Sequence, residues 1–282
     1  MKSPWTINYR PETDVSPELP PLKAAYFQSL IGVLRWIVEL GRVDIAMEVS
    51  AMASMMAMPR EGHLKQLFHI FAFLNIKHNS AMVFDPTEPD IDDSQFVRED
   101  WTASPYGECK EELPSNMPPP KGIGFSMRAF VESDHAGNLA TRRSRTGFII
   151  FLNSAPIYWF SKSQTSVETS SFGAEFIAMK VCCEYIRGLR YKLRMMGIPV
   201  NLPTYIFGDN QSVLCNTTSP HSSLKKKSSS IAFHYIREGT AKDEWRTAYI
   251  NTHHNPSDML TKSLPSGEKR TRFTSFVLHY VS

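Results

Sequence analysis

The chain has 282 residues, of which 42% are apolar and 21% are charged. This composition can bury one large core or two smaller ones and excludes a wholly disordered polypeptide. A formal net charge of +3 does not by itself indicate a nucleic-acid partner. Basic residues do gather late in the chain, within 187–194 and at Lys225, Lys226 and Lys227.

The four cysteines form no Cys-x-x-Cys pair, and two of them, Cys182 and Cys183, are adjacent. Neither a disulfide framework nor a zinc site is expected from this pattern, which favours a reducing, intracellular location in the cytoplasm or the nucleus. The first residues lack the apolar stretch of a signal peptide, and no run reaches the roughly 18 apolar residues that a membrane span needs. We therefore expect neither secretion nor a membrane partner.

Apolar residues at helical spacing predict three helices in the first part of the chain. The first covers 23–40, the second runs from Asp44, a plausible N-cap, to a stop before Pro59, and the third covers 63–74. Short connections join them. Residues 1–84 are therefore predicted to form a small helical unit.

Helical and strand periodicity disappears between residues 85 and 121, where prolines and acidic residues accumulate. This composition predicts a linker. Its aromatic residues Phe96, Trp101 and Tyr106 indicate that the linker lies along a folded surface, because a free tether has few such groups.

Residues 122–282 show an α/β pattern. The order of elements, three strands followed by alternating helices and strands, is typical of a mixed sheet with helices on its faces. The expected strands are 126–131, 146–152, 155–160, 204–207 and 245–251, and the expected helices are 172–196, 229–241 and one that begins near 257.

Acidic residues fall at the ends of several of these elements. Glu132 and Asp134 end the first strand, Glu175 opens the long helix, Asp209 follows a strand and Asp258 opens the last helix. Carboxylate oxygens are the ligands that magnesium prefers, and two ions roughly 3.5–4 Å apart can stabilise both oxygens of a phosphodiester displacement. For Glu175 and Asp258 taken singly, a role in capping their helices explains the position equally well.

Six segments, in order, resemble the signature blocks of the ribonuclease H domain of copia-type retrotransposon Pol polyproteins. They are ESDHAG (132–137), RRSRTGF (142–148), SAPIYWFSKSQ (154–164), SSFGAEFIAM (170–179), FGDNQSVL (207–214) and NPSDMLTK (255–262). Residues 27–50 resemble the region that follows the polymerase palm in the same polyproteins. The resemblance implies a ribonuclease H-like mixed sheet with flanking helices, preceded by a helical thumb or connection unit.

The resemblance also implies that Glu175, Asp209 and Asp258 bind Mg²⁺ or Mn²⁺, and that their carboxylates converge. The first block of the family usually reads Asp-x-Asp, and Glu132 takes the place of its first aspartate. Either Glu132 or Asp134 would complete the set of ligands. A glutamate carries its carboxylate about one methylene further out, which a two-ion site tolerates poorly.

The implied activity is metal-dependent hydrolysis of the RNA strand of RNA–DNA hybrids. Lys225, Lys226 and Lys227 would contact phosphates, or would form a solvated face. No Tyr-x-Asp-Asp block is present, so we expect no polymerase active site, and a polymerase part would be a partner. Two alternatives are a catalytically degenerate nucleic-acid-binding remnant and a structural connection domain.

Overall fold

The computed structural model describes residues 2–224 and 230–281. Its strands are β1 (Ser80–Met82), β2 (Met127–Asp134), β3 (Arg145–Leu152), β4 (Ala155–Ser163), β5 (Thr204–Gly208), β6 (Trp245–Tyr249) and β7 (Leu278–Tyr280). Its α-helices are α1 (Pro21–Glu39), α2 (Ala46–Ala53), α3 (Glu61–Ile76), α4 (Ser171–Met195), α5 (Gln211–Thr218), α6 (Ser230–Ala241), α7 (Asp258–Thr261) and α8 (Glu268–Ser275). Short 3₁₀ helices cover Pro11–Thr13, Val43–Ile45 and Asp93–Gln95.

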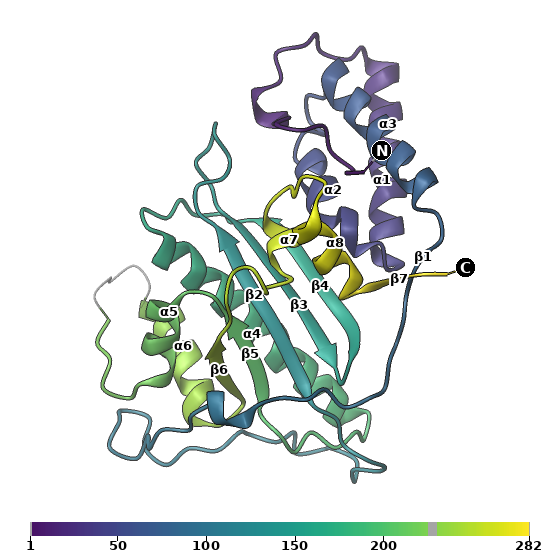
Figure 1. Cartoon of the computed structure of the whole chain (residues 1–282). Helices are drawn as coiled ribbons and strands as arrows, with labels where there is room; N and C mark the ends of the chain where they lie inside the picture. The colour runs from purple at the N-terminus through teal and green to yellow at the C-terminus, as the bar shows by residue number, and fades with distance from the viewer. Residues whose placement is uncertain (1, 225–229, 282) are drawn as a thin grey trace.

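The five strands β2 to β6 form one mixed sheet in the order β4-β3-β2-β5-β6. β2, β3 and β4 pair antiparallel, whereas β5 lies parallel to β2 and to β6. Flanking helices accompany the sheet (Figure 1). The mixed α/β fold class expected from the sequence is confirmed.

Alternating side chains of β2 point to opposite faces of the sheet. Met127, Ala129 and Val131 pack with α4 and α6 in one hydrophobic cluster. Phe130 packs with α7, α8 and the N-terminal helices in a second cluster on the other face. In Figure 1, α7 and α8 cross the near face of the sheet while α4 lies behind it. None of the helices in the described ranges combines the length and apolar character of a membrane span.

The N-terminal helices form where the sequence predicts them, although the second is shorter. α1 buries Phe27, Ile31, Leu34 and Val38 at helical spacing. The proposed N-cap role of Asp44 is wrong: α2 begins after Ile45 without a side-chain cap. The carboxylate of Asp44 instead pairs with Arg42, whose Nη2 lies 2.9 Å away.

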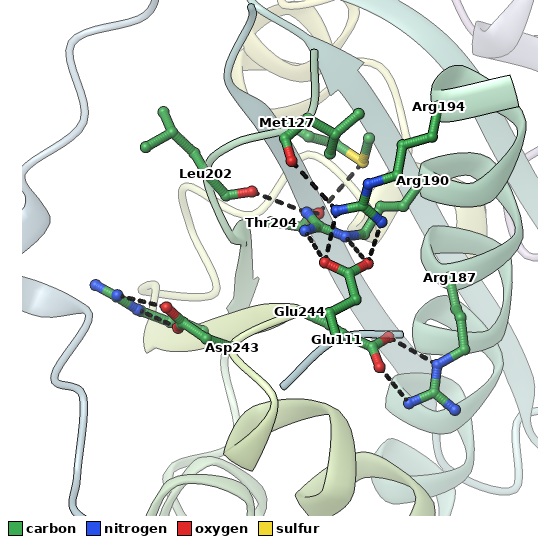
Figure 2. A network of polar contacts seen from close by, with 11 residues as sticks. Glu111, Met127, Arg187, Arg190, Arg194, Leu202, Thr204, Asp243 and Glu244 are labelled. Atoms are coloured by element: carbon green, nitrogen blue, oxygen red, sulfur yellow. Dashed lines mark hydrogen bonds and ion pairs between the residues drawn. The ribbon is translucent and has the colours of Figure 1, made fainter. Parts of the chain in front are cut away.

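The linker lies along the folded surface, as its aromatic residues indicate. Phe96 is buried and packs edge-on against Tyr205, with ring centroids 4.7 Å apart. Farther along, Glu111 accepts hydrogen bonds from Arg190 (2.6 Å) and Arg194 (2.7 Å) of α4, in the network drawn in Figure 2. The linker is therefore attached to the sheet through β5 and to α4 through a carboxylate.

The C-terminal residues return to the N-terminal helices. β7 pairs antiparallel with β1, and Phe273 of α8 belongs to the same hydrophobic cluster as Leu34 of α1. The sequence did not predict β1, β7 or α8. Because one cluster joins both units, the division into 1–84, 85–121 and 122–282 is a division of the sequence, and independent folding of its parts stays a prediction.

Candidate active site

The candidate site lies where the β2–β5 ladder stops. The last parallel pair is Phe130 with Phe207, yet β2 continues to Asp134. The backbone of β2 is therefore free of β5 beyond Phe130, and other groups approach it there. Asn255, for example, donates from Nδ2 to the carbonyl of Val131 at 3.0 Å. This topology brings residues far apart in the chain to one end of the sheet.

Glu132 occupies the centre of this region and is 2% exposed. Its carboxylate accepts hydrogen bonds from the hydroxyl of Thr261 and the ammonium of Lys262. Burial raises the pKa of Glu132 to about 8, and the neighbouring Asp258 acts in the same direction. Glu132 thus points toward α7, and its negative charge is costly unless a cation lies close by.

Asp258 opens α7 and is fully buried. It does not cap the helix: Lys262 Nζ donates to its Oδ1 at 2.9 Å, and Lys269 of α8 donates to its other oxygen. Burial alone would raise the pKa of Asp258, but hydrogen bonds with Glu132 and the two lysines outweigh it and hold the pKa below its usual value. Lys262 therefore bridges the carboxylates of Glu132 and Asp258.

Glu175 lies in the second turn of α4, and the hydroxyl of Ser170, not Glu175, caps that helix. Burial raises the pKa of Glu175 to about 9, and the negative charges of Glu132 and Asp209 raise it further. Glu175 therefore lies within electrostatic reach of both carboxylates. No basic side chain in the described ranges forms an ion pair with it.

Asp209 follows β5 directly and is half-buried. Its Oδ2 accepts a hydrogen bond from the hydroxyl of Thr252 at 2.8 Å, which fixes the side chain beside the end of β6. The negative charges of Glu132 and Asp209 raise the pKa of Glu175, and that of Asp258 raises the pKa of Glu132, so we call these four carboxylates the acidic series.

Asp134, the second acidic residue of the first block, has a different environment. Its Oδ1 accepts the backbone N–H of Arg145 at 2.7 Å, which closes the end of the β2–β3 ladder. Burial raises its pKa, while this hydrogen bond and the positive charge of Arg145 act the other way. The side chain also fills the space beside Gly137, where a Cβ would meet Oδ2 at 1.7 Å. Asp134 therefore shapes the hairpin, and of the two candidates Glu132 is the one that shares the ammonium of Lys262 with Asp258.

The sequence did not single out Thr261, Lys262, Lys269 or Gln164. The first two belong to the block NPSDMLTK, so a signal for them was present. Gln164 ends the block SAPIYWFSKSQ and is buried; its Nε2 donates to Thr146 (3.1 Å) and to the carbonyl of Ala174 (2.9 Å). It thereby ties β3 to the first turn of α4, one residue before Glu175.

The acidic series suits a divalent cation in its chemistry. Its donors are hard carboxylate oxygens, and the raised pKa values of Glu132 and Glu175 reflect negative charges crowded in a buried place, which a cation would relieve. Within residues 2–224 and 230–281, however, no three His, Cys, Asp or Glu side chains have the spacing of a formed metal site. Lys262 and Lys269 already neutralise one end of the series. The chemistry of these donors therefore fits an ion, whereas their spacing among the described residues does not form a metal site.

Lys225, Lys226 and Lys227, predicted as phosphate contacts, lie outside the described residues.

Similarity to known proteins covers most of the chain. It is 26% identical over 250 residues to the Retrovirus-related Pol polyprotein from transposon RE1 of Arabidopsis thaliana, which covers 89% of this chain and 14% of the polyprotein. Over 156 residues it is 29% identical to the corresponding polyprotein from transposon RE2 of the same plant, which covers 55% of this chain and 10% of that protein. Both of these relatives are Pol polyproteins of transposons.

A third such polyprotein, from transposon TNT 1-94 of Nicotiana tabacum, is 22% identical over 239 residues, 85% of this chain and 15% of its own length. These relatives confirm the expected resemblance to copia-type Pol polyproteins. The chain spans at most 15% of the length of these three Pol polyproteins. No protein-family model matches the chain.

Among solved structures, the chain is similar to LC11-RNase H1 isolated from compost, with a TM-score of 0.39 and 15% identity over 48% of this chain and 92% of that one. It is also similar to LC11-RNase H1 in complex with an RNA/DNA hybrid, with a TM-score of 0.40 and 14% identity over 48% of this chain and 94% of that one.

Proposed function

We propose that this chain is the ribonuclease H part of a copia-type reverse transcriptase and hydrolyses the RNA strand of RNA–DNA hybrids with Mg²⁺ or Mn²⁺. The observation that supports this most directly is the acidic series at the end of the β2–β5 ladder, where Glu175 lies within electrostatic reach of both Glu132 and Asp209. These residues come from β2, from α4 and from the end of β5, and no pattern in the local sequence would bring them together.

In this proposal Glu175 and Asp209 hold one ion together with Glu132, and Asp258 helps to hold a second. A bound divalent ion would supply Lewis-acid stabilisation of the charge that develops on the phosphodiester during attack by water. The chain's own groups orient the ligands: Thr252 fixes Asp209, and Thr261 fixes Glu132. Such positioning matters because a small displacement of a reacting group costs a large part of the rate.

Lys262 would leave the carboxylates when an ion binds. Its side chain is 43% exposed while those of Glu132 and Asp258 are almost fully buried, so the lysine can turn toward solvent without disturbing the core. In that position its ammonium would lie near the incoming phosphate backbone. Recognition of the hybrid would rest on phosphates and 2′-hydroxyls, as it does for A-form helices in general.

The rest of a Pol polyprotein would supply the polymerase as a partner. This part of the proposal follows from the length of the relatives, of which the chain spans at most 15%. The hybrid that a reverse transcriptase produces would then be the substrate delivered to this site.

One observation favours a second candidate, a degenerate nucleic-acid-binding remnant. Lys262 and Lys269 neutralise Glu132 and Asp258, and a permanent ion pair there would leave too few carboxylates for two ions. In that case the chain would bind a hybrid without cutting it.

The two candidates are separated by a cleavage assay on a hybrid with a labelled RNA strand, in Mg²⁺ and then in chelator. We expect cleavage in Mg²⁺ only, absent on duplex DNA, and reduced at least about 100-fold in Asp209→Asn, because a charged ligand is removed at constant size. Cleavage that survives in chelator, or in Asp209→Asn, would come from another nuclease. Hybrid binding without cleavage would support the remnant.

A further inference from the structure

The hairpin between β2 and β3, residues 135–144, carries two of the three arginines of the block RRSRTGF. Arg142 and Arg143 are exposed at its far side. Within residues 2–224 and 230–281, no hydrogen-bond or ion-pair partner accompanies either guanidinium. The third arginine of the block, Arg145, differs from them: its Nη1 donates to Ser50 Oγ at 2.8 Å and to Ser161 Oγ at 3.3 Å. One arginine is thus structural, and two face solvent.

The hairpin that carries the two exposed arginines is held firmly from within. Asn138 Oδ1 accepts the backbone N–H groups of Ala140 (3.1 Å) and Thr141 (2.7 Å), and the N–H of Arg142 donates to the carbonyl of Asn138 at 2.8 Å. At its base, the fully buried Ser144 accepts the N–H of Ala136 at 3.0 Å. Such a network fixes the backbone from which the arginines project.

The N-terminal segment braces the hairpin from outside. Arg10 Nη1 donates to the carbonyl of Gly137 at 2.9 Å, and Glu12 Oε1 accepts the N–H of Leu139 at 3.1 Å. Arg142 itself adopts φ = +56°, a left-handed conformation that disfavours most side chains. A loop that is only solvated needs neither a rigid backbone nor a strained residue. The rigid backbone lowers the conformational entropy that the two arginines lose when they bind a ligand.

The place of this hairpin relative to the candidate site is set by the β2–β3 ladder. Asp134 pairs with Arg145 at its end, and Glu132 pairs with Gly147. At about 3.3 Å per residue, Arg143 lies roughly 13 Å along the strand from the level of Glu132. On the scale of double-stranded DNA, where successive phosphates of one strand advance about 3.4 Å along the helix axis, this distance corresponds to a few nucleotides.

We infer that Arg142 and Arg143 bind the phosphate backbone of the hybrid a few nucleotides from the phosphodiester that water would attack beside Glu132. The inference rests on the proposed function for its substrate. It adds to that function that the β2–β3 hairpin sets the position of the hybrid along the candidate site. Guanidinium groups suit this role because they remain charged and can donate two parallel hydrogen bonds to a phosphate.

The test measures hybrid binding in chelator, where cleavage is absent, by fluorescence anisotropy at several salt concentrations. The variant is Arg142→Asn/Arg143→Gln, since asparagine tolerates the left-handed conformation at 142. Each phosphate contact contributes about 0.9 to the slope of log K against log salt, so we expect the slope to fall by about one to two. The matched control Arg35→Gln/Lys65→Gln removes the same charge from exposed positions in α1 and α3 and should leave the slope unchanged.

A second variant, Arg142→Lys/Arg143→Lys, keeps both charges and should retain most of the slope. Thermal unfolding of each variant shows whether the hairpin change has altered the fold. A slope in Arg142→Asn/Arg143→Gln equal to that of the parent, or equal losses in the control, would overturn the inference, and so would a parent that does not bind the hybrid. The parent could bind the hybrid with a steeper salt slope than Arg142→Asn/Arg143→Gln and yet never cleave it. The ribonuclease proposal then fails, while the assignment of the hairpin to phosphate binding stands.

Discussion

Gly147 lies opposite Glu132 in the β2–β3 ladder, and α7 packs directly on it. A Cβ at 147 would come 2.6 Å from Thr261 Cγ2 and 2.9 Å from Leu260 Cβ. Gly147→Ala must therefore displace α7, and with it the hydroxyl that orients Glu132. We expect a loss of about 1–3 kcal/mol in the free energy of unfolding, measured in urea, and a loss of hybrid cleavage much larger than the loss of hybrid binding.

Gly188→Ala is the matched control, because a Cβ there meets nothing within 4 Å on the exposed side of α4. Alanine is the better helix former, so this variant should be up to about 1 kcal/mol more stable with unchanged cleavage. If Gly147→Ala has the same stability and cleavage as Gly188→Ala, the close packing of α7 on β3 contributes to neither.

The sequence predicted the sheet and the long helices because each repeats its signal many times. α4 buries an apolar residue at nearly every turn, and β2, β3 and β5 each contain an uninterrupted apolar run, at 129–131, 148–152 and 205–207. The helix expected near 257 is present as the four-residue α7, whereas three-residue β7 is too short for periodicity and forms by pairing with β1.

The acidic positions of the candidate site could be named from the blocks, but their partners could not. Nothing in the spacing of Asp258 and Lys262 reveals that the ammonium also reaches Glu132, which is 130 residues away in the chain. Likewise, Asp44 has the right residue type for an N-cap, yet a nearby arginine binds its carboxylate more strongly than backbone N–H groups would. Local sequence patterns do not indicate which of several possible partners a carboxylate binds.

If Glu132 is the first ligand of the proposed site, restoring the family's usual aspartate there should increase cleavage. In Glu132→Asp the carboxylate withdraws by about one methylene from Lys262, toward the backbone of β2 near Glu175 and Asp209. We expect Mg²⁺-dependent hybrid cleavage to rise by about tenfold, equivalent to about 1.4 kcal/mol of barrier. Single-turnover kinetics on a labelled hybrid would measure this change.

Asp134→Asn is the companion variant. Its amide oxygen can still accept the N–H of Arg145, so the hairpin should persist and cleavage should change little. The reverse pattern, abolished cleavage in Asp134→Asn and no gain in Glu132→Asp, would make Asp134 the first ligand. Equal inactivity of both variants and the parent, with hybrid binding intact, would favour the binding remnant.

In the proposed function, Lys262 would compete with a metal ion for Glu132 and Asp258. Lys262→Met keeps much of the side-chain length but removes the charge, so the two carboxylates lose their bridging ammonium. We expect Mg²⁺ to bind roughly tenfold more tightly by isothermal titration calorimetry, since a charge-assisted hydrogen bond contributes about 1.5–3 kcal/mol. Lys192→Met, at an exposed position near the end of α4, should leave the affinity unchanged. Weaker binding in Lys262→Met would show that the lysine assists the ion and does not compete with it.

Glu111 should make the stability of the linker attachment depend on pH. Although burial acts to raise its pKa, hydrogen bonds from Arg190 and Arg194 outweigh burial and hold the pKa of Glu111 at about 2, below its ordinary value of 4.5. A lowered carboxyl pKa stabilises the fold above pH 4.5, and that stabilisation is lost as the pH falls toward 2. Glu111→Gln leaves two buried guanidinium groups unpaired, and we expect it to cost about 3 kcal/mol at pH 7.

Urea unfolding at pH 7 and at pH 3 measures this dependence. The difference between the parent and Glu111→Gln should be smaller at pH 3, where part of the stabilisation by the ionised Glu111 has been lost. The side chain of the neighbouring Glu112 is 90% exposed and lies 3.5 Å from Lys242 Nζ. Glu112→Gln should therefore have the same free energy of unfolding as the parent at both pH values. A difference between Glu111→Gln and the parent that does not change with pH would mean that ionisation of Glu111 does not stabilise the attachment.

Limited proteolysis should cut first within residues 85–121, where the backbone forms few regular hydrogen bonds and only a short 3₁₀ helix interrupts it. The two halves share one hydrophobic cluster and the β1–β7 pair, so we expect the nicked halves to remain together on a sizing column. Glu111→Gln should be nicked several-fold faster than the parent, because the linker loses its attachment to α4. If the linker resists while the helices or the sheet are cleaved, the boundary at 85–121 is wrong and the segment belongs to the core. If the nicked halves instead separate and each stays folded, the N-terminal helices and the sheet are independent domains despite their common cluster.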